Sequence, residues 1–176
     1  ALREGTAHAT GDYIAFCDAD LDLAPEQLAD FIDRMQRENA DVVIGSKMHP
    51  ESKVDYPAIR RVYSWGYYIL LLLLFRLNVR DTQTGLKLFK AEVIKPVMRQ
   101  ILVKRFAFDI EVLAIINARG YKIISAPIEV VFHRVSFGRI GFSDIRNMFI
   151  DTLAIFYRLH ILHYYDKVEA HPELKE

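Results

Sequence analysis

Short apolar runs alternate along this chain with longer segments whose apolar residues recur at helical spacing. The continuous apolar run over residues 13–17 is typical of a buried central strand, and residues 41–45 predict a second one. Between them, helical spacing over 25–37 predicts a helix that starts at Pro25. The alternation of strands and helices favours an α/β fold with a largely parallel sheet.

The same alternation continues to residue 165, so residues 1–165 are predicted to form one domain. Residues 166–176 are highly charged and predict a disordered tail. The chain does not begin with Met and opens in a helix-like segment, so its natural N-terminus is expected to lie outside it. The later predicted elements are helices over 58–77, 91–101, 108–118 and 142–165, and strands over 121–125 and 128–132.

Charge is distributed unevenly, although the 23 basic and 23 acidic side chains balance. Residues 1–56 hold twelve acidic and five basic side chains, whereas residues 57–149 hold six acidic and fifteen basic ones. A basic middle segment suits phosphate groups or an anionic membrane surface. Because helix-turn-helix, RNA-recognition and zinc-finger signatures are missing, nucleic acid is not an expected partner.

Two further features limit the class of protein. The single cysteine, Cys17, excludes an internal disulfide and is predicted to be a buried, small apolar residue. The apolar run over residues 65–75 is shorter than the ~20 residues that a membrane span requires. This run is therefore predicted to be a buried or interfacial helix.

Candidate chemistry lies directly after the first predicted strand. Asp18 and Asp20 are two residues apart, so on an extended backbone both carboxylates point to one side, where they repel unless a cation separates them. Mg²⁺ or Mn²⁺, with further ligands from nucleotide phosphates, would meet that need. Loop or capping roles are the commoner use of such triplets. A calcium loop is excluded, because Leu23 and Ala29 stand where Gly and Glu are required.

Seven segments, in order, cover most of residues 5–145 and together resemble the family 2 glycosyltransferases. The closer resemblance is to the branch that makes polyprenyl-phosphate sugars, such as dolichyl-phosphate mannose and glucose synthases. The segments are Gly11-Asp12-Tyr13-Ile14-Ala15-Phe16, Asp18-Ala19-Asp20-Leu21, Gly45-Ser46-Lys47, Arg60 with Ser64, Asp81-Thr82-Gln83-Thr84-Gly85-Leu86-Lys87-Leu88-Phe89, Phe106-Ala107-Phe108-Asp109-Ile110-Glu111, and Ala126-Pro127-Ile128.

The resemblance implies the C-terminal part of a GT-A domain, which is Rossmann-like with a mostly parallel sheet, together with amphipathic membrane-interface helices. The family's nucleotide-binding half, with its Pro-x-x-Asn/Asp-Glu motif, is not in this chain. The Gln-x-x-Arg-Trp motif of processive synthases is also missing, which favours transfer of a single sugar.

The resemblance also implies roles for particular residues. Asp18, Asp20 and Asp22 would hold the metal, although an N-cap before Pro25 is an equal reading of Asp22. Arg60 and Ser64 share a helix face and would hold the acceptor phosphate, unless Arg60 is merely solvated.

Five charged or polar positions complete the predicted substrate site. Lys47 would meet a phosphate as a point charge. Arg134 and Arg139 would reach acceptor and donor phosphates, against the alternative of a basic surface turn. Asp81 and Gln83 would face the sugar or the acceptor.

Two acidic residues begin the predicted helix over 108–118. For Asp109, a helix-start carboxylate without any function is the stronger reading. Glu111 is the weaker structural case, and it is predicted to touch the sugar.

The predicted activity is inverting transfer of one hexose from GDP-mannose or UDP-glucose to polyprenyl or dolichyl phosphate. The expected location is the cytoplasmic face of a membrane, either peripheral or tethered by segments outside this chain. A family 2 transferase with a saccharide or soluble acceptor stays an alternative. So does an inactive, membrane-associated module, because the nucleotide-binding half is not in the chain.

Overall fold

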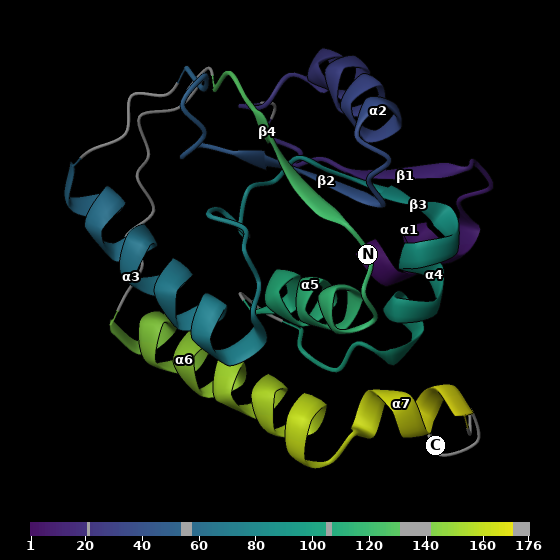
Figure 1. Ribbon diagram of the computed structural model, residues 1–176, viewed down its shortest axis with the longest axis vertical. Helices are drawn as coiled ribbons and strands as arrows, with labels where there is room; N and C mark the ends of the chain where they lie inside the picture. The colour runs from purple at the N-terminus through teal and green to yellow at the C-terminus, as the bar shows by residue number, and fades with distance from the viewer. Residues whose placement is uncertain (21, 54–57, 105–106, 131–141, 171–176) are drawn as a thin grey trace.

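The computed structural model describes residues 1–20, 22–53, 58–104, 107–130 and 142–170 (Figure 1). Most of the predicted helices and strands are present, but a strand over residues 87–90 was not predicted. In chain order they are α1 (Leu2–His8), β1 (Tyr13–Phe16), η1 (Pro25–Gln27), α2 (Leu28–Arg37), β2 (Val42–Ser46), α3 (Ala58–Phe75), β3 (Lys87–Lys90), α4 (Ala91–Gln100), α5 (Phe108–Ala118), β4 (Ile123–Pro127), α6 (Phe142–Phe156), the π-helical segment η2 (Tyr157–Ile161) and α7 (Tyr164–Ala170).

The sheet is mixed, so the prediction of a largely parallel sheet was wrong. Its order is β1-β3-β2-β4, and β3 runs antiparallel to both of its neighbours. Only β2 and β4 pair in parallel. Strand β3 is the reason: it follows the turn at residues 81–85 and enters between two strands that precede it in sequence. The α/β class itself is confirmed.

Strand β1 lies at an edge of the described sheet rather than in its centre. Its side chains alternate, with Ile14 and Phe16 buried and Tyr13 exposed. An edge strand covered on one face keeps only every second side chain from water. Cys17 follows the last strand residue and is exposed, so the prediction of a buried cysteine was wrong.

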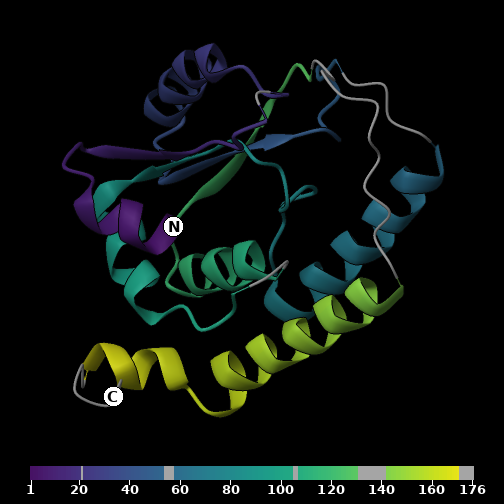
Figure 2. The same ribbon diagram turned by 180° about the vertical axis from the view of Figure 1, so that it is seen from behind.

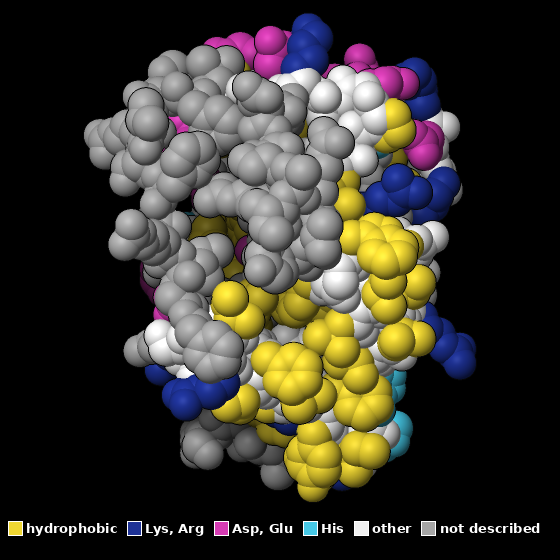
Figure 3. All heavy atoms as spheres, turned by 90° about the vertical axis from the view of Figure 1, so that its left-hand side faces the viewer, with side chains coloured by type: hydrophobic (Ala, Val, Ile, Leu, Met, Phe, Trp, Pro, Cys, Tyr) yellow, Lys and Arg dark blue, Asp and Glu magenta, His cyan; other side chains and the backbone are white. Residues whose placement is uncertain are grey.

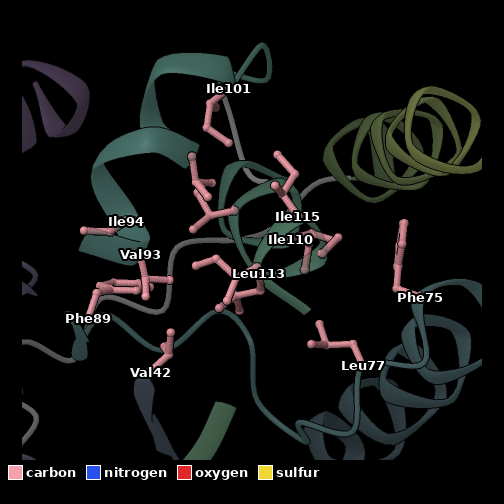
Figure 4. Close-up of a cluster of buried hydrophobic side chains, with 14 of the residues drawn as sticks. Val42, Phe75, Leu77, Phe89, Val93, Ile94, Ile101, Ile110, Leu113 and Ile115 are labelled. Carbon is pink, nitrogen blue, oxygen red and sulfur yellow. The ribbon is translucent and has the colours of Figure 1, made fainter. Parts of the chain in front are cut away.

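Two apolar clusters cover the two faces of the sheet. On one face, Val43 and Leu88 pack with Phe31 and Met35 of α2. On the other face, Val42 and Phe89 belong to a larger cluster with α4 and α5 (Figure 4). Neighbouring strand residues point to opposite faces, and this alternation divides β2 and β3 between the two clusters.

Helices α3 and α6 lie side by side as an outer layer, beyond α5 (Figures 1 and 2). They are joined by a hydrogen bond of 2.9 Å between the hydroxyls of Tyr67 and Thr152. Within the described residues, no helix has the length and apolar character needed to cross a membrane.

The C-terminal region differs from its prediction in two ways. The final helix is not continuous over 142–165, because His163 has a φ of 49° and separates η2 from α7. Helix α7 then extends to Ala170, into the segment predicted as a tail, where Val168 is buried. The division into a domain over 1–165 and a tail stays a prediction. Of the predicted strand over 128–132, the described part makes only isolated bridges.

Candidate active site

The two carboxylates of the Asp-x-Asp triplet lie just beyond the end of β1, and both side chains are exposed. The antiparallel pairing of Phe16 with Lys87 brings this strand end beside the start of β3. The backbone N–H of Asp22 donates to Asp20 Oδ1 over 3.2 Å. Residues 11–20 and 81–90, far apart in sequence, therefore meet at one edge of the sheet.

Gly85 lies against the carboxylate of Asp18. A Cβ atom built on Gly85 would be 1.9 Å from Asp18 Oδ2, a distance that no side chain tolerates. The missing side chain of Gly85 is thus what leaves room for the Asp18 carboxylate.

Lys87 is a buried cation behind this pair, with an exposure of 3%. Its Nζ lies 2.9 Å from Asp109 Oδ1 and donates to the carbonyl of Thr84 over 2.5 Å. From the sequence, Asp109 is interpreted mainly as a helix-start carboxylate, and Lys87 has no predicted role. The available signal was a lysine inside an apolar strand, which is rarely buried without a partner.

The electrostatics of Asp18 show which charges surround it. Partial burial, followed by the nearby charge of Asp20, raises the pKa of the Asp18 carboxyl. Lys87 and Lys47 oppose this increase, and Asp109 adds to it. A carboxylate whose proton affinity is raised by a neighbouring carboxylate lies where a cation is favoured.

The carboxylates of Asp18 and Asp20 are the kind of ligand that a hard divalent cation prefers, but they do not fill its coordination shell. Among the residues that the structure describes, no three His, Cys, Asp or Glu side chains gather into a metal-binding group. Mg²⁺ is commonly held by one or two carboxylates together with substrate phosphates and water, which is what Asp18 and Asp20 allow. Asp22 as a third ligand stays a prediction.

Lys47, whose charge acts on Asp18, contacts Asp81. The backbone N–H of Lys47 donates to Asp81 Oδ2 over 3.0 Å, so Asp81 fixes the turn after β2. Gln83 is exposed, and its Nε2 donates to Met148 Sδ on α6 over 3.0 Å. The contact of Lys47 with a phosphate, and those of Asp81 and Gln83 with the sugar or the acceptor, stay predictions.

Glu111 does not line the site, so its predicted contact with the sugar was wrong. Its side chain has no exposed surface, and its carboxylate accepts hydrogen bonds from Leu102, Val103, Arg158 and Tyr165. Residue 111 lies on the inner side of α5, whereas Asp109 lies two positions earlier and contacts Lys87. A rotation of about 200° between positions i and i+2 of a helix explains this difference.

The remaining predicted residues fall in three places. Ser64 lies on α3 and is half-buried. Arg60 also belongs to α3, but its side chain is outside the described part. Arg134 and Arg139 lie outside the described residues altogether.

An open cleft of about 1000 Å³ adjoins the site. Gln83 and Asp109 line it, together with the loop Ile101–Lys104 after α4. Asp109, the partner of Lys87, therefore faces this cleft.

Apolar side chains gather over the face formed by α3 and α6 (Figure 3). We call this face the α3/α6 surface. The repeated leucines are divided between core and surface, since Leu71 is 1% exposed and Leu73 is 76% exposed. Tyr165 of α7 is buried. The exposed members of the surface are Trp65, Leu73, Ile145, Phe149, Ile150 and Leu153.

Comparison with known proteins decides the family. The model of glycosyl transferase family 2 matches residues 1–98, more than half of the chain. The chain belongs to glycosyl transferase family 2. The resemblance drawn from the seven sequence segments is thereby confirmed.

The relatives in this family are themselves glycosyltransferases. The dolichyl-phosphate beta-glucosyltransferase ALG5D of Trichomonas vaginalis is 31% identical over 172 residues, covering 92% of this chain and 51% of the relative. ALG5C of the same organism is 28% identical over 179 residues, covering 97% and 52%. The chain thus spans about half the length of the curated relatives it matches.

Solved structures show the same fold. Glucosyl-3-phosphoglycerate synthase of Mycobacterium tuberculosis, with Mn²⁺, UDP-glucose and phosphoglyceric acid, superposes with a TM-score of 0.62 at 17% identity. The match covers 89% of this chain and 52% of the synthase. The synthase has also been solved with Mg²⁺ and UDP. The GT-A fold expected from the sequence is thereby confirmed.

Proposed function

We propose that the protein containing this chain transfers one glucose from a nucleotide-glucose donor to polyprenyl or dolichyl phosphate, with inversion. The observation that carries the proposal is the close approach of Gly85 to Asp18, beside Asp20 and the Lys87–Asp109 pair. Glucose is preferred over mannose because relatives matching nearly the whole chain are dolichyl-phosphate beta-glucosyltransferases.

The chemistry requires positioning and cations more than proton transfer. A polyprenyl monophosphate is already ionised at neutral pH, so its oxygen needs little general-base help to attack the anomeric carbon. The new carbon–oxygen bond forms as the bond to the nucleoside diphosphate breaks. Attack opposite the leaving group gives a β-linked product from an α-linked donor.

Each described residue has a part in this scheme. Asp18 and Asp20 would hold Mg²⁺ or Mn²⁺, which neutralises charge on the leaving diphosphate when bound. Lys47, beside Asp18, supplies a further positive charge for phosphate. Lys87 is too deeply buried to reach a substrate, so it acts through Asp109 and Asp18 as a positioning residue.

The acceptor phosphate would be held by residues that the structure describes only in part. Arg60, Ser64, Arg134 and Arg139 keep the roles that the family resemblance implies. Arg134 and Arg139 favour a phosphate-bearing acceptor over a neutral saccharide, because a guanidinium group can bind phosphate through two hydrogen bonds.

The transfer assay uses the intact protein in membranes with labelled UDP-glucose or GDP-mannose and Mg²⁺ or Mn²⁺. Label is then extracted into organic solvent, and wild type is compared with Asp20→Ala. We expect lipid-phase label from UDP-glucose that is lost with Asp20→Ala or with EDTA. Label only in the aqueous phase would overturn the lipid acceptor, and an α-linked product would overturn inversion.

We further propose that the α3/α6 surface binds the membrane that holds the lipid acceptor. Leucine, phenylalanine and tryptophan side chains facing water suit the acyl boundary of a bilayer, since each gains free energy on leaving water. The test is co-sedimentation of the double variant Leu73→Ser, Phe149→Ser with vesicles containing anionic lipid. Binding should fall in the variant and persist in the control Leu2→Ser, an exposed leucine on α1. Equal binding of both would remove this proposal.

A further inference from the structure

One buried carboxylate joins the C-terminal region to the loop that lines the cleft. Glu111 Oε2 accepts the backbone N–H groups of Leu102 and Val103, over 2.9 and 2.8 Å. Glu111 Oε1 accepts the hydroxyl of Tyr165 over 2.5 Å and Arg158 Nη2 over 3.3 Å. We call these five residues the Glu111 network.

The chemistry of the network shows why it holds firmly. A carboxylate without exposed surface is costly unless it is paired and hydrogen-bonded, and here a guanidinium and three further donors surround it. Burial, followed by the charge of Glu111 and its hydrogen bond, raises the pKa of Tyr165, which therefore stays a donor. Removal of one donor leaves part of a buried charge unsatisfied.

The loop held by Glu111 belongs to the cleft. Leu102 and Val103 both line it, and Leu102 is 41% exposed while its backbone N–H points inward to Glu111. Two residues before Glu111 on the same helix, Asp109 contacts Lys87. The position of α5 therefore affects both the cleft loop and the buried ion pair.

The donors on the other side come from a separate part of the chain. Arg158 lies in η2 and Tyr165 in α7, which follow directly on α6 and its share of the α3/α6 surface. Arg158 Nε also donates to the Tyr165 hydroxyl over 3.1 Å, so the two donors are linked to one another. The network spans 63 positions of sequence between Leu102 and Tyr165.

We propose that Glu111 is a positioning residue, and that Arg158 and Tyr165 of the C-terminal segment fix the cleft loop Ile101–Lys104 through it. The expected effect on sugar transfer rests on the proposed function, whereas the expected effect on the loop does not. A substrate bound in the cleft would meet a loop whose backbone is set from behind by the segment adjoining the α3/α6 surface.

The test is hydrogen exchange of the intact protein carrying Tyr165→Phe, which removes one hydroxyl. We expect the amides of Leu102 and Val103 to exchange about tenfold faster, since loss of a hydrogen bond to a charged group weakens local protection by this order. The amides of Val43 and Leu88 in the sheet report global stability in the same experiment. The matched control is Tyr164→Phe, which removes the same atom from the neighbouring, half-buried tyrosine.

Outcomes separate the positioning role from general destabilisation. Faster exchange confined to Leu102 and Val103, with a several-fold increase in donor KM at nearly constant kcat, supports the proposal. Equal acceleration in loop and sheet, or the same change with Tyr164→Phe, would overturn it. A second variant, Arg158→Gln, should give the same loop-confined change. If wild type transfers no sugar while the exchange pattern holds, the proposed function fails and this inference stands.

Discussion

Lys87 Nζ lies 2.9 Å from Asp109 Oδ1, and the lysine is almost wholly buried while the carboxylate is partly open to the cleft. The pair joins β3 to the first turn of α5, at the level where Asp18 leaves β1. A buried cation thus lies beside two carboxylates, those of Asp18 and Asp109.

Replacement of the buried lysine should destabilise the protein strongly. Lys87→Met leaves Asp109 without its partner in a largely buried position, and we expect a loss of about 3 kcal/mol in the free energy of unfolding. The matched control is Lys53→Met, which breaks the exposed pair with Glu129 and should cost at most about 0.5 kcal/mol. Urea denaturation measures both. Equal losses would show that the Lys87–Asp109 pair contributes no more than a surface pair.

The contact between Gly85 and Asp18 predicts a loss of activity without unfolding. Gly85→Ala forces the Asp18 carboxylate to move, and we expect sugar transfer to fall about 100-fold. Gly66→Ala on α3 is the control, because the new Cβ has no neighbour within 4 Å beyond the adjoining residues and the backbone of its own helix. It should keep full transfer and stabilise the helix by about 0.5–1 kcal/mol. Normal transfer by Gly85→Ala would mean that the Asp18 position is unimportant.

The three aspartates after β1 should differ in their effect on metal use. Asp18→Asn and Asp20→Asn should each lower transfer by about 100-fold, because each removes a charge that holds the cation. Asp22→Asn should lower it less than tenfold, since the described residues form no three-carboxylate group. Titration of transfer activity with Mn²⁺ gives both the maximal rate and the half-saturating concentration. A loss with Asp22→Asn as large as with Asp20→Asn would make Asp22 a full ligand.

A second ion pair predicts how stability depends on pH. Asp41 Oδ1 lies 2.7 Å from Lys90 Nζ, and Asp41 Oδ2 accepts the backbone N–H of Lys122 over 2.9 Å. Partial burial by itself raises the pKa of Asp41, but the hydrogen bonds from Lys90 and Lys122 outweigh it, so the pKa is lowered overall. Asp41 therefore stabilises the fold above its unfolded pKa of about 4, and that contribution is lost as pH falls through the lowered value.

The corresponding variant is Asp41→Asn, compared with wild type by urea denaturation at pH 7 and below pH 4. We expect wild type to be more stable by about 1 kcal/mol at pH 7, with the difference shrinking as the solution is acidified. Asp33→Asn, at an exposed position of α2, should change stability by less than about 0.5 kcal/mol at both values. A difference for Asp41→Asn that grows on acidification would contradict the sign of the shift.

Much of the architecture was predictable because it depends on local patterns. The apolar runs before Asp18 and Ser46 predicted β1 and β2, and helical spacing predicted α2 through α5 to within a few residues. The Asp-x-Asp triplet was found for the same reason, since two carboxylates after a strand form a local signal. Its neighbour Lys87 had no such signal beyond its apolar surroundings.

The sequence by itself determined the α/β class, the family and the position of the strand-end carboxylates, because short-range periodicity and motif order carry that information. Tertiary structure alone decided that β3 runs antiparallel, that Lys87 meets Asp109, and that Glu111 is buried. Those features depend on contacts between residues that are remote in sequence, such as Glu111 and Tyr165. The free energy of such contacts comes from burial and charge pairing in the folded chain, which no local pattern records.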